Sequence, residues 1–478
     1  MHYYLYPKGT NAKVVAWGLE NFFENVSFSF IDDGDPISSL EANLEIIKKG
    51  IEGGEAEILI CSKRFCDVIL EKLFNNGIRE CRNGLELVAN KINAYYKDKF
   101  PMYKRIGILL DGYGANQKHL GNIPMYLQKF GFKVIYLIVP DSEWLEDIKG
   151  KGGILSDDEL VYVTDEFLEL FDFYPFIIFQ NERLTKLNPN VTSLKLFVTA
   201  EQMSNQIVRY NPNYAAMEVL GNGLCDYVNV HSESLYNAML ERLSEVKKTV
   251  GVNNGKFLKG GYPSIDKQIA DFTDKDCKRD TIIFISSHGF YENCMDFVEE
   301  AVWSLIDKYR ILWKSHPVFA KKLSFEEEMS LIKKFMHHKN FVYYREARLN
   351  QAELERSICI MVNTSSMGYS YPPLAKRPAI LLYPSESVKL LQTTKDAYYN
   401  PKIHIRYIQA SAGGGGNCGE LVSIVRNLAE DKATQQQWKD KIEDYCKNDL
   451  FNYGCASEFI AKWICNWYKN REILKESC

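Results

Sequence analysis

The feature that most constrains this chain is the repeated alternation of short apolar runs with stretches of helical spacing. Each apolar run has the character of a buried strand and ends in a polar turn before the next helix begins. Strand–helix–strand alternation of this length implies parallel pairing with right-handed crossovers. The predicted strands are residues 26–31, 57–61, 105–110, 133–139, 176–179, 194–198, 227–230, 281–285, 311–313, 341–343, 358–362 and 379–382. The sequence therefore predicts an α/β protein made of doubly wound parallel sheets.

Two polar passages interrupt the alternation and suit linkers between folded units. One contains a proline among charged residues just after position 97, and the other is rich in asparagine and glycine between 253 and 263. At 478 residues the chain is also too long for a single core. We expect three units: a small Rossmann-like domain at 1–97, a first lobe at 103–262 and a second lobe at 263–478.

The N-terminal domain shows little sign of a working cofactor site. Residues 3–20 have the pattern of a strand, a turn and a helix, but only Gly9 stands where a dinucleotide fingerprint has three glycines. Asp32 and Asp33 mimic an acidic catalytic motif of sialyltransferases. They follow a strand of this extra domain, so we interpret them as turn residues.

Composition argues against several classes of function. With 58 basic and 62 acidic residues, the net charge of −4 lacks the basic excess of a nucleic-acid binder. The 12 cysteines form no Cys-x-x-Cys pair and no signal peptide opens the chain, so we expect free thiols in a cytoplasmic protein. No apolar run is long enough to span a bilayer. The aromatic segment 459–468 could touch a membrane surface, but its spacing favours a terminal helix packed on the core.

Two predicted strands of the second lobe end abruptly in residues that suit a phosphate group. The first ends in Trp313-Lys-Ser-His-Pro317, and the second runs into Ser365 and Ser366. Pro317 disfavours the helical region for His316, so its ring should project beyond the sheet. The serines would offer hydroxyls beside the free amides of a helix N-terminus. Ligands of such sheets bind at the carboxyl ends of strands, so this pattern predicts a nucleotide-activated donor.

Other polar residues at predicted strand ends extend the candidate site. Lys314 could add positive charge, although a lysine at a strand end can also be simply solvated. Ser286, Ser287 and His288 follow the first strand of the second lobe, where a strand–helix turn commonly meets phosphates. Asp111 ends the first strand of the first lobe beside two glycines and is a candidate general base. Asp111 could instead be a turn residue or an N-cap. His316 could likewise be a helix-capping or surface histidine, and Ser365 and Ser366 could form a plain N-cap.

The motifs resemble those of the CDP-glycerol glycerophosphotransferases of teichoic acid and capsule synthesis and of their GT-B relatives. Gly-Tyr-Pro-Ser-Ile-Asp at 261–266 is similar to that family's Gly-Tyr-Pro-Arg-Asn-Asp between the lobes. Trp-Lys-Ser-His-Pro at 313–317 resembles its Tyr-Arg-Pro-His-Pro. Val-Asn-Thr-Ser-Ser-Met at 362–367, with Ala-Lys-Arg-Pro-Ala-Ile at 375–380, resembles its Thr-Asp-Tyr-Ser-Ser segment and trailing Lys-Pro. The resemblance spans 103–470 and implies a GT-B fold whose second lobe binds the donor. His-Pro and Ser-Ser in this order also occur in bacterial sialyltransferases, which use CMP-linked donors.

The chain departs from the family pattern in two places. Where the family carries Trp-His-Gly-Thr-Pro-Leu-Lys in the first lobe, with its histidine as the proposed base, this chain has Val-Thr-Ala-Glu-Gln-Met-Ser-Asn at 198–205. Glu201 therefore takes the place of the histidine loop and is an alternative to Asp111 as base. Asn363 replaces the aspartate ahead of the Ser-Ser pair. A cytidine-linked sugar is thus as compatible with the sequence as glycerophosphate.

The sequence predicts a cytoplasmic transferase that needs neither metal nor cofactor. His337 and His338 have no carboxylate or cysteine at ligand spacing, and no Asp-x-Asp motif follows a strand. The enzyme would move a sugar or polyol-phosphate group from a CMP- or CDP-linked donor to a glycan or lipid-linked acceptor at the inner face of the membrane. Two alternatives stay open: a nucleotide-sugar epimerase or hydrolase of similar fold, and a non-catalytic scaffold of a glycan assembly complex.

Overall fold

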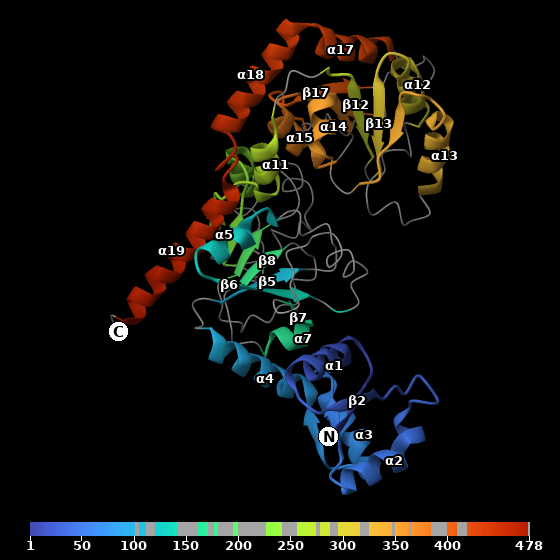
Figure 1. Ribbon diagram of the computed structural model, residues 1–478, viewed down its shortest axis with the longest axis vertical. Coiled ribbons are helices and arrows are strands. Elements are labelled where there is room, and N and C mark those ends of the chain that lie inside the picture. The colour runs from blue at the N-terminus through green and yellow to red at the C-terminus, as the bar shows by residue number, and fades with distance from the viewer. Residues whose placement is uncertain are drawn as a thin grey trace.

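The computed structural model describes most of the chain as three parallel sheets that follow one another along one long axis (Figure 1). The described residues are 1–100, 105–110, 120–138, 140, 160–170, 176–179, 195–198, 226–240, 256–273, 278–286, 295–315, 325–346, 349–362, 365–383, 399–408 and 418–476. The N-terminal sheet lies at one end, the sheet of the first lobe in the middle and the sheet of the second lobe at the other end.

The N-terminal unit is a four-stranded parallel sheet with the order β2-β1-β3-β4. Its strands are β1 (His2–Tyr6), β2 (Ser27–Phe30), β3 (Ala56–Ile60) and β4 (Cys81–Asn83). Its helices are α1 (Thr10–Phe22), α2 (Leu40–Glu52), α3 (Cys66–Asn75) and α4 (Gly84–Lys99). Ser39 and Asn83 cap α2 and α4 by accepting hydrogen bonds from Ala42 N and Glu86 N. Helices α2 and α3 share one apolar cluster with the sheet, and α1 and α4 belong to another.

The first lobe is a seven-stranded parallel sheet with the order β11-β10-β9-β8-β5-β6-β7. Its strands are β5 (Arg105–Leu110), β6 (Lys133–Ile138), β7 (Leu160–Tyr162), β8 (Phe176–Phe179), β9 (Lys195–Val198), β10 (Tyr227–Asn229) and β11 (Lys256–Leu258). Helices α5 (Ile123–Lys129) and α7 (Asp165–Leu168) accompany it. The strand order reverses between β5 and β8, which makes this pair the switch point of the sheet.

The second lobe is a six-stranded parallel sheet with the order β14-β13-β12-β15-β16-β17. Its strands are β12 (Thr281–Ile285), β13 (Arg310–Lys314), β14 (Phe341–Tyr343), β15 (Ser357–Val362), β16 (Ala379–Tyr383) and β17 (His404–Ile408). Helices α12 (Met295–Ile306), α13 (Phe325–Phe335) and α17 (Cys418–Glu430) share one core cluster with the sheet. Helices α14 (Gln351–Arg356) and α15 (Met367–Ala375) share another. The switch point lies between β12 and β15.

The chain crosses between the lobes twice. It first passes through Pro263–Ile265 into α11 (Asp266–Asp271), and it returns from α18 (Lys432–Asn448) into α19 (Ala456–Glu476). Figure 1 shows α18 and α19 running along the side of both lobes. Ile460 and Ile464 of α19 are buried in one cluster with Ile123 and Leu127 of α5, so the predicted core-packed terminal helix is confirmed. Within the described ranges, no helix is both long and apolar enough to cross a bilayer.

Every predicted strand is present, with bounds that agree with the prediction or differ by one residue at an end. Four strands were not predicted: β4, β7, β11 and β17. Strands β4, β7 and β11 have only three residues each, too few to show a period of two. Strand β11 also lies inside the passage predicted as a linker, so the described link between the lobes begins after Leu258.

The N-terminal unit shares a core with the first lobe. Val88 and Ile92 of α4 are fully buried in the same cluster as Leu137 of β6 and Phe167 of α7. Polar contacts accompany this core: Asn93 Nδ2 donates to Leu170 O at 3.0 Å, and Lys63 Nζ lies 2.6 Å from a carboxylate oxygen of Glu169. Thr164 Oγ1 also donates to Asn11 Oδ1 at 2.5 Å, and Glu166 Oε2 accepts from Lys63 N at 2.5 Å and from Arg64 N at 3.4 Å.

This shared core gives an expectation for a fragment that begins at Tyr103. Removing the N-terminal unit would expose the buried first-lobe side chains that it covers, so we expect the fragment to aggregate or to bind a hydrophobic dye. Dye fluorescence and sedimentation of the fragment beside the full chain would measure this. A soluble fragment with a cooperative thermal transition would show instead that the N-terminal unit is dispensable for folding.

Candidate functional site

The candidate donor site lies at the carboxyl edge of the second-lobe sheet, around its switch point. Strands β13, β12 and β15 are adjacent, and the register pairs Ile285 with Lys314 and Phe284 with Met361, so the three strands end level. Neighbouring strands lie about 4.8 Å apart. The residues that follow these strands, Ser286, Ser315 and Ser365, therefore gather at one edge of the sheet.

Ser365 and Ser366 stand at the beginning of α15, as predicted. Ser365 Oγ accepts a hydrogen bond from Met367 N at 3.3 Å, so this hydroxyl already caps the first turn. Ser366 occupies the N-cap position without a capping bond from its side chain. Both serines are half-buried. A contact with strand β17 fixes the first turn of α15, since His404 Nε2 lies 2.9 Å from Gly368 O.

Lys314 is buried and bonded, so the alternative of a solvated lysine is wrong. Its side chain is 6% exposed, and Nζ donates to Glu346 O at 2.6 Å. The ammonium also lies 5.8 Å from the ring centre of Tyr344. The charged side chain thus ties the end of β13 to the chain that follows β14. Ser286 is also buried, and its backbone N donates to Lys314 O at 3.1 Å.

A buried acidic residue that the sequence reasoning missed fixes the end of β13. Oε1 of Glu328 accepts from Trp313 Nε1 at 2.7 Å and from Ser315 Oγ at 2.6 Å, and Glu328 is 2% exposed. The Trp313 ring also stacks on Phe284 with the ring centres 5.6 Å apart. Glu328 shares the buried helical face of Leu331 and could have been found from that spacing. The residues immediately before His316 are thus fixed by two sets of contacts, those of Lys314 with Glu346 and those of Trp313 and Ser315 with Glu328.

Several predicted site residues lie outside the described residues. These are His316, Ser287 and His288 of the second lobe and Asp111 and Glu201 of the first lobe. Their roles stay predictions. Asp111 directly follows β5 at the first-lobe switch point, and Glu201 comes soon after β9 in the chain.

The Gly-Tyr-Pro-Ser-Ile-Asp motif forms the joint between the lobes. Asp266 is 6% exposed, and its carboxylate accepts from Ala456 N at 3.3 Å and Ser457 N at 2.6 Å. Burial raises the pKa of Asp266, although these amide hydrogen bonds favour its charged form. Ser457 Oγ in turn accepts from Asn122 N at 3.1 Å. The motif therefore binds the start of α19 to both lobes.

Gly261 of this motif has no room for a side chain. Its φ is +88°, and a Cβ atom would stand 2.2 Å from Phe451 O. Gly131 has the same φ, but a Cβ atom there would have no neighbour within 4 Å. We expect Gly131→Ala to cost about 1–2 kcal/mol from the left-handed backbone alone, and Gly261→Ala to cost roughly 2–5 kcal/mol because the clash adds to it. Chemical unfolding of both variants would measure the difference, and equal losses would contradict a tight joint.

The acidic pair of the N-terminal unit is structural, as the sequence indicated. Asp33 accepts from Tyr6 OH at 2.5 Å and from Lys72 Nζ at 2.6 Å. Burial by itself would raise the pKa of Asp33, but the hydrogen bonds from Lys72 and Tyr6 hold the pKa below its ordinary value. Asp32 Oδ1 accepts from Gly34 N at 3.0 Å, which closes a turn.

Among the described residues, no group of three or more histidine, cysteine, aspartate or glutamate side chains could hold a metal ion. His338 instead faces Asp307, with Nε2 and Oδ1 separated by 3.3 Å.

Comparison with known proteins defines the fold. No protein-family model and no curated protein sequence matches this chain. A solved structure of S. aureus MnaA with UDP is similar at a TM-score of 0.50 and 13% identity, covering 77% of this chain and 97% of that one. The wall teichoic acid polymerase TagF is similar at a TM-score of 0.48 and 14% identity, covering 85% and 97%. The lipopolysaccharide outer core galactosyltransferase WaaB follows at 0.43 and 9%, covering 76% and 99%.

At such low sequence identities the similarity concerns the fold alone. The fold assignment rests on the comparison with MnaA. Together with the two doubly wound sheets and their crossing helices, it shows a GT-B fold of two Rossmann-like lobes. The predicted fold class is confirmed.

Proposed function

We propose that this chain is a GT-B transferase that moves a sugar or polyol-phosphate group from a cytidine-nucleotide donor to a surface glycan. The observation that carries the proposal is the gathering of Ser286, Ser365 and Ser366 at the switch point of the second lobe, with the buried Lys314 at the end of the adjacent strand β13. Doubly wound sheets bind nucleotides at such a point. The similar fold of MnaA was solved with UDP, which supports a nucleotide-linked donor.

The donor phosphates would bind at the start of α15. The Ser366 hydroxyl would donate to a phosphate oxygen, and the positive end of the α15 dipole would favour negative charge there. Lys314, at the end of β13, would add positive charge to the same edge of the sheet. Ser287 and His288 would contact the phosphates from the turn after β12. His316 would donate to the departing nucleotide, and its charged form would be favoured beside the phosphates.

The acceptor would be a glycan or lipid-linked hydroxyl between the lobes. Asp111 or Glu201 would take the proton from that hydroxyl as its oxygen attacks the donor. The bond between the transferred group and the nucleotide phosphate then breaks, and the phosphate leaves with the bonding electron pair. The first lobe would supply the base and the second lobe would stabilise the leaving group, so no metal would be required. A lipid-linked acceptor would bring the protein to the inner face of the membrane.

The nucleotide and the need for an acceptor distinguish this proposal from its alternatives. The likeness to a UDP complex makes a uridine-linked donor the second candidate. An epimerase or hydrolase of the same fold would convert the donor without an acceptor. A scaffold would bind no nucleotide.

Calorimetric titration with CMP, CDP, UDP and GDP is the direct test. We expect one of the four nucleotides to bind. The double variant Ser365→Ala/Ser366→Ala should lower the affinity for that nucleotide by roughly 10–100-fold, because hydrogen bonds to a charged phosphate are lost. Ser370→Ala, in the same helix α15, is the matched control and should bind within about twofold.

Each other outcome selects an alternative. Binding of none of the four nucleotides would favour the scaffold. Consumption of the activated donor without acceptor would identify a hydrolase or epimerase. Unchanged binding in the double serine variant would refute the phosphate grip at α15.

A further inference from the structure

A cavity lies at the opposite edge of the second-lobe sheet, away from the candidate donor site. Its volume is about 260 Å³, and its lining includes Arg279, Ile358 and Pro378, which stand next to or at the amino ends of β12, β15 and β16. The donor site lies at the carboxyl ends of the same strands. Five residues of β12 at about 3.3 Å each separate the two edges by roughly 17 Å. The cavity is therefore a different site.

The lining of this cavity is strongly cationic. Its lining residues contain no aspartate or glutamate. Its charged members are Arg279, Lys376, Arg377, Lys432 and Lys439. Lys376 and Arg377 belong to the Ala-Lys-Arg-Pro segment, which resembles a motif of the transferase family. The proposed donor site does not use these two residues. Trp438 adds an aromatic surface.

Two of the cations are fixed by hydrogen bonds to the protein. Arg377 is 5% exposed, and its Nη1 donates to Leu354 O at 2.7 Å and Glu355 O at 3.0 Å. Lys376 adopts a left-handed backbone with φ +55°, and its Nζ donates to Tyr453 OH at 2.7 Å. These carbonyl and hydroxyl partners fix both side chains in place. Positive charge is thus built into the wall of the cavity.

The described carboxylates that adjoin the lining in sequence are engaged elsewhere. Asp280 lies 2.9 Å from Arg356 Nη2, Glu430 pairs with Lys308, and Asp431 accepts from the amides of Ala433 and Thr434 at the start of α18. Asp440 is the exception, because its Oδ1 accepts from Nε2 of the lining residue Gln436 at 2.7 Å. A bound anion would be attracted by all of the cations that line the cavity.

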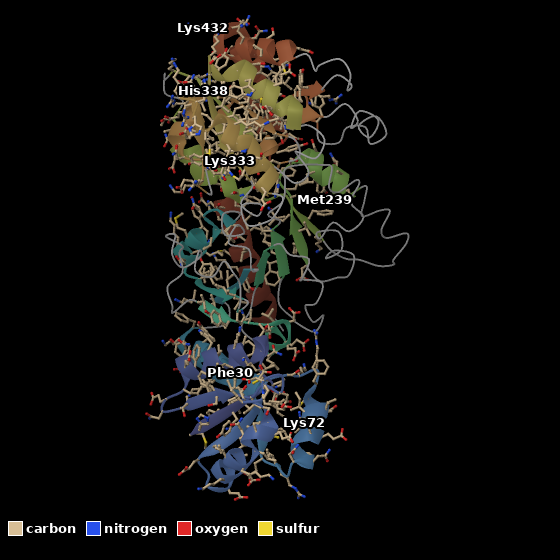
Figure 2. The ribbon with its side chains drawn as sticks, turned by 90° about the vertical axis from the view of Figure 1, so that its right-hand side faces the viewer. Phe30, Lys72, Met239, Lys333, His338 and Lys432 are labelled. Carbon is tan, nitrogen blue, oxygen red and sulfur yellow. The ribbon has the colours of Figure 1, made fainter. Side chains whose placement is uncertain are left out.

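We propose that this cavity binds a phosphate-bearing anion of small size. Several cations around one space suit the multiple charge and three acceptor oxygens of a phosphate ester better than a single carboxylate. The volume is below the roughly 300–1,000 Å³ of pockets that enclose drug-sized ligands, so it fits a phosphate with a short substituent rather than a whole nucleotide. A soluble phosphate ester and the headgroup of an anionic lipid both carry this chemistry. Lys432 lies at the far end of the second lobe in Figure 2, away from the N-terminal unit.

Fluorine NMR of the full chain with 5-fluorotryptophan can separate the two sites. The chain has seven tryptophans; Trp438 lines the cavity, and Trp313 reports on the end of β13 beside the donor site. Trp438→Phe and Trp313→Phe would assign the two resonances. With inorganic pyrophosphate as the probe, we expect a saturable shift of the Trp438 resonance. Lys432→Gln/Lys439→Gln should weaken the apparent Kd from that resonance by about tenfold or more.

A charge-matched control guards against a general loss of positive charge. Lys333→Gln/Lys447→Gln removes two lysines outside the cavity and should leave the Kd within about twofold. The proposal is overturned if only the Trp313 resonance responds, if the cavity variant binds as tightly as the parent chain, or if the control variant loses binding equally. An unchanged thermal transition of the cavity variant without pyrophosphate would confirm that it folds.

Vesicles distinguish the two sources of the phosphate. A lipid headgroup predicts that the parent chain sediments with phosphatidylglycerol vesicles, that the cavity variant does not, and that phosphatidylcholine vesicles bind neither. A soluble ester predicts equal sedimentation of both proteins together with the pyrophosphate response of Trp438. Loss of vesicle binding in the control variant as well would contradict a lipid site in this cavity.

Discussion

Replacing His316 by alanine is expected to lower turnover by roughly 10²–10³-fold, which is the cost of removing one preorganised donor to developing charge. A proline at 317 disfavours a helical backbone at His316, and the chain before the histidine is fixed by the bonds of Lys314 and Ser315. The side chain should therefore serve the phosphate rather than the packing, and the melting temperature should stay within a few degrees. His316→Asn should recover little, because an amide cannot carry the charge. Steady-state kinetics with the nucleotide identified by calorimetry would measure the loss.

His337→Ala is the matched control, since His337 is an exposed residue after α13 in the same lobe. Its turnover should equal that of the parent chain. Near-normal transfer by His316→Ala would refute the leaving-group role. Unfolding of that variant would show that the His-Pro motif serves packing instead.

Replacing Glu328 by leucine is expected to destabilise the second lobe and to reduce turnover together. The change leaves the indole N–H of Trp313 and the hydroxyl of Ser315 buried without their acceptor. Each buried donor without a partner costs about 1–3 kcal/mol, so the free energy of unfolding should fall by roughly 2–5 kcal/mol. Since Ser315 precedes His316 directly, loss of this anchor should also lower kcat beyond what stability alone explains. Unfolding in denaturant and kcat measured well below the thermal transition would separate the two effects.

Glu328→Gln should restore part of both quantities, because its amide oxygen can still accept one of the two bonds. Glu326→Leu, at an exposed position of the same helix α13, should change neither. A Glu328→Leu variant with reduced stability but normal kcat would show that the glutamate holds the fold and does not position the histidine.

The sequence predicted the sheets well because most of their strands are short apolar runs, and β12 and β15 are buried along their whole length. The runs that became β5, β8, β12 and β14 have the predicted bounds, since a buried parallel strand is a continuous apolar run closed by a polar turn. It also indicated which polar residues follow those strands. Because parallel strands end at a common edge, Ser286 and Ser365 could be assigned to one edge before their contacts were visible.

Contacts between distant segments could not be predicted in this way. The burial of Lys314 depends on the carbonyl of Glu346, and that of Glu328 on the indole of Trp313; neither partner is marked by a local pattern. The short strands β4, β7 and β11 are likewise stabilised by neighbours already in the sheet rather than by their own residues.

The sequence by itself therefore determined the alternation, the strand ends and the polar residues placed there, because these follow from local hydrophobic periodicity. Only the tertiary structure decided that α4 of the N-terminal unit shares a core with the first lobe. It also placed Lys376 and Arg377 at the edge opposite to Ser365, although the motif follows that serine closely in the chain. The physical reason is that helix α15 carries the chain back along the sheet, so a separation of eleven residues spans both of its edges.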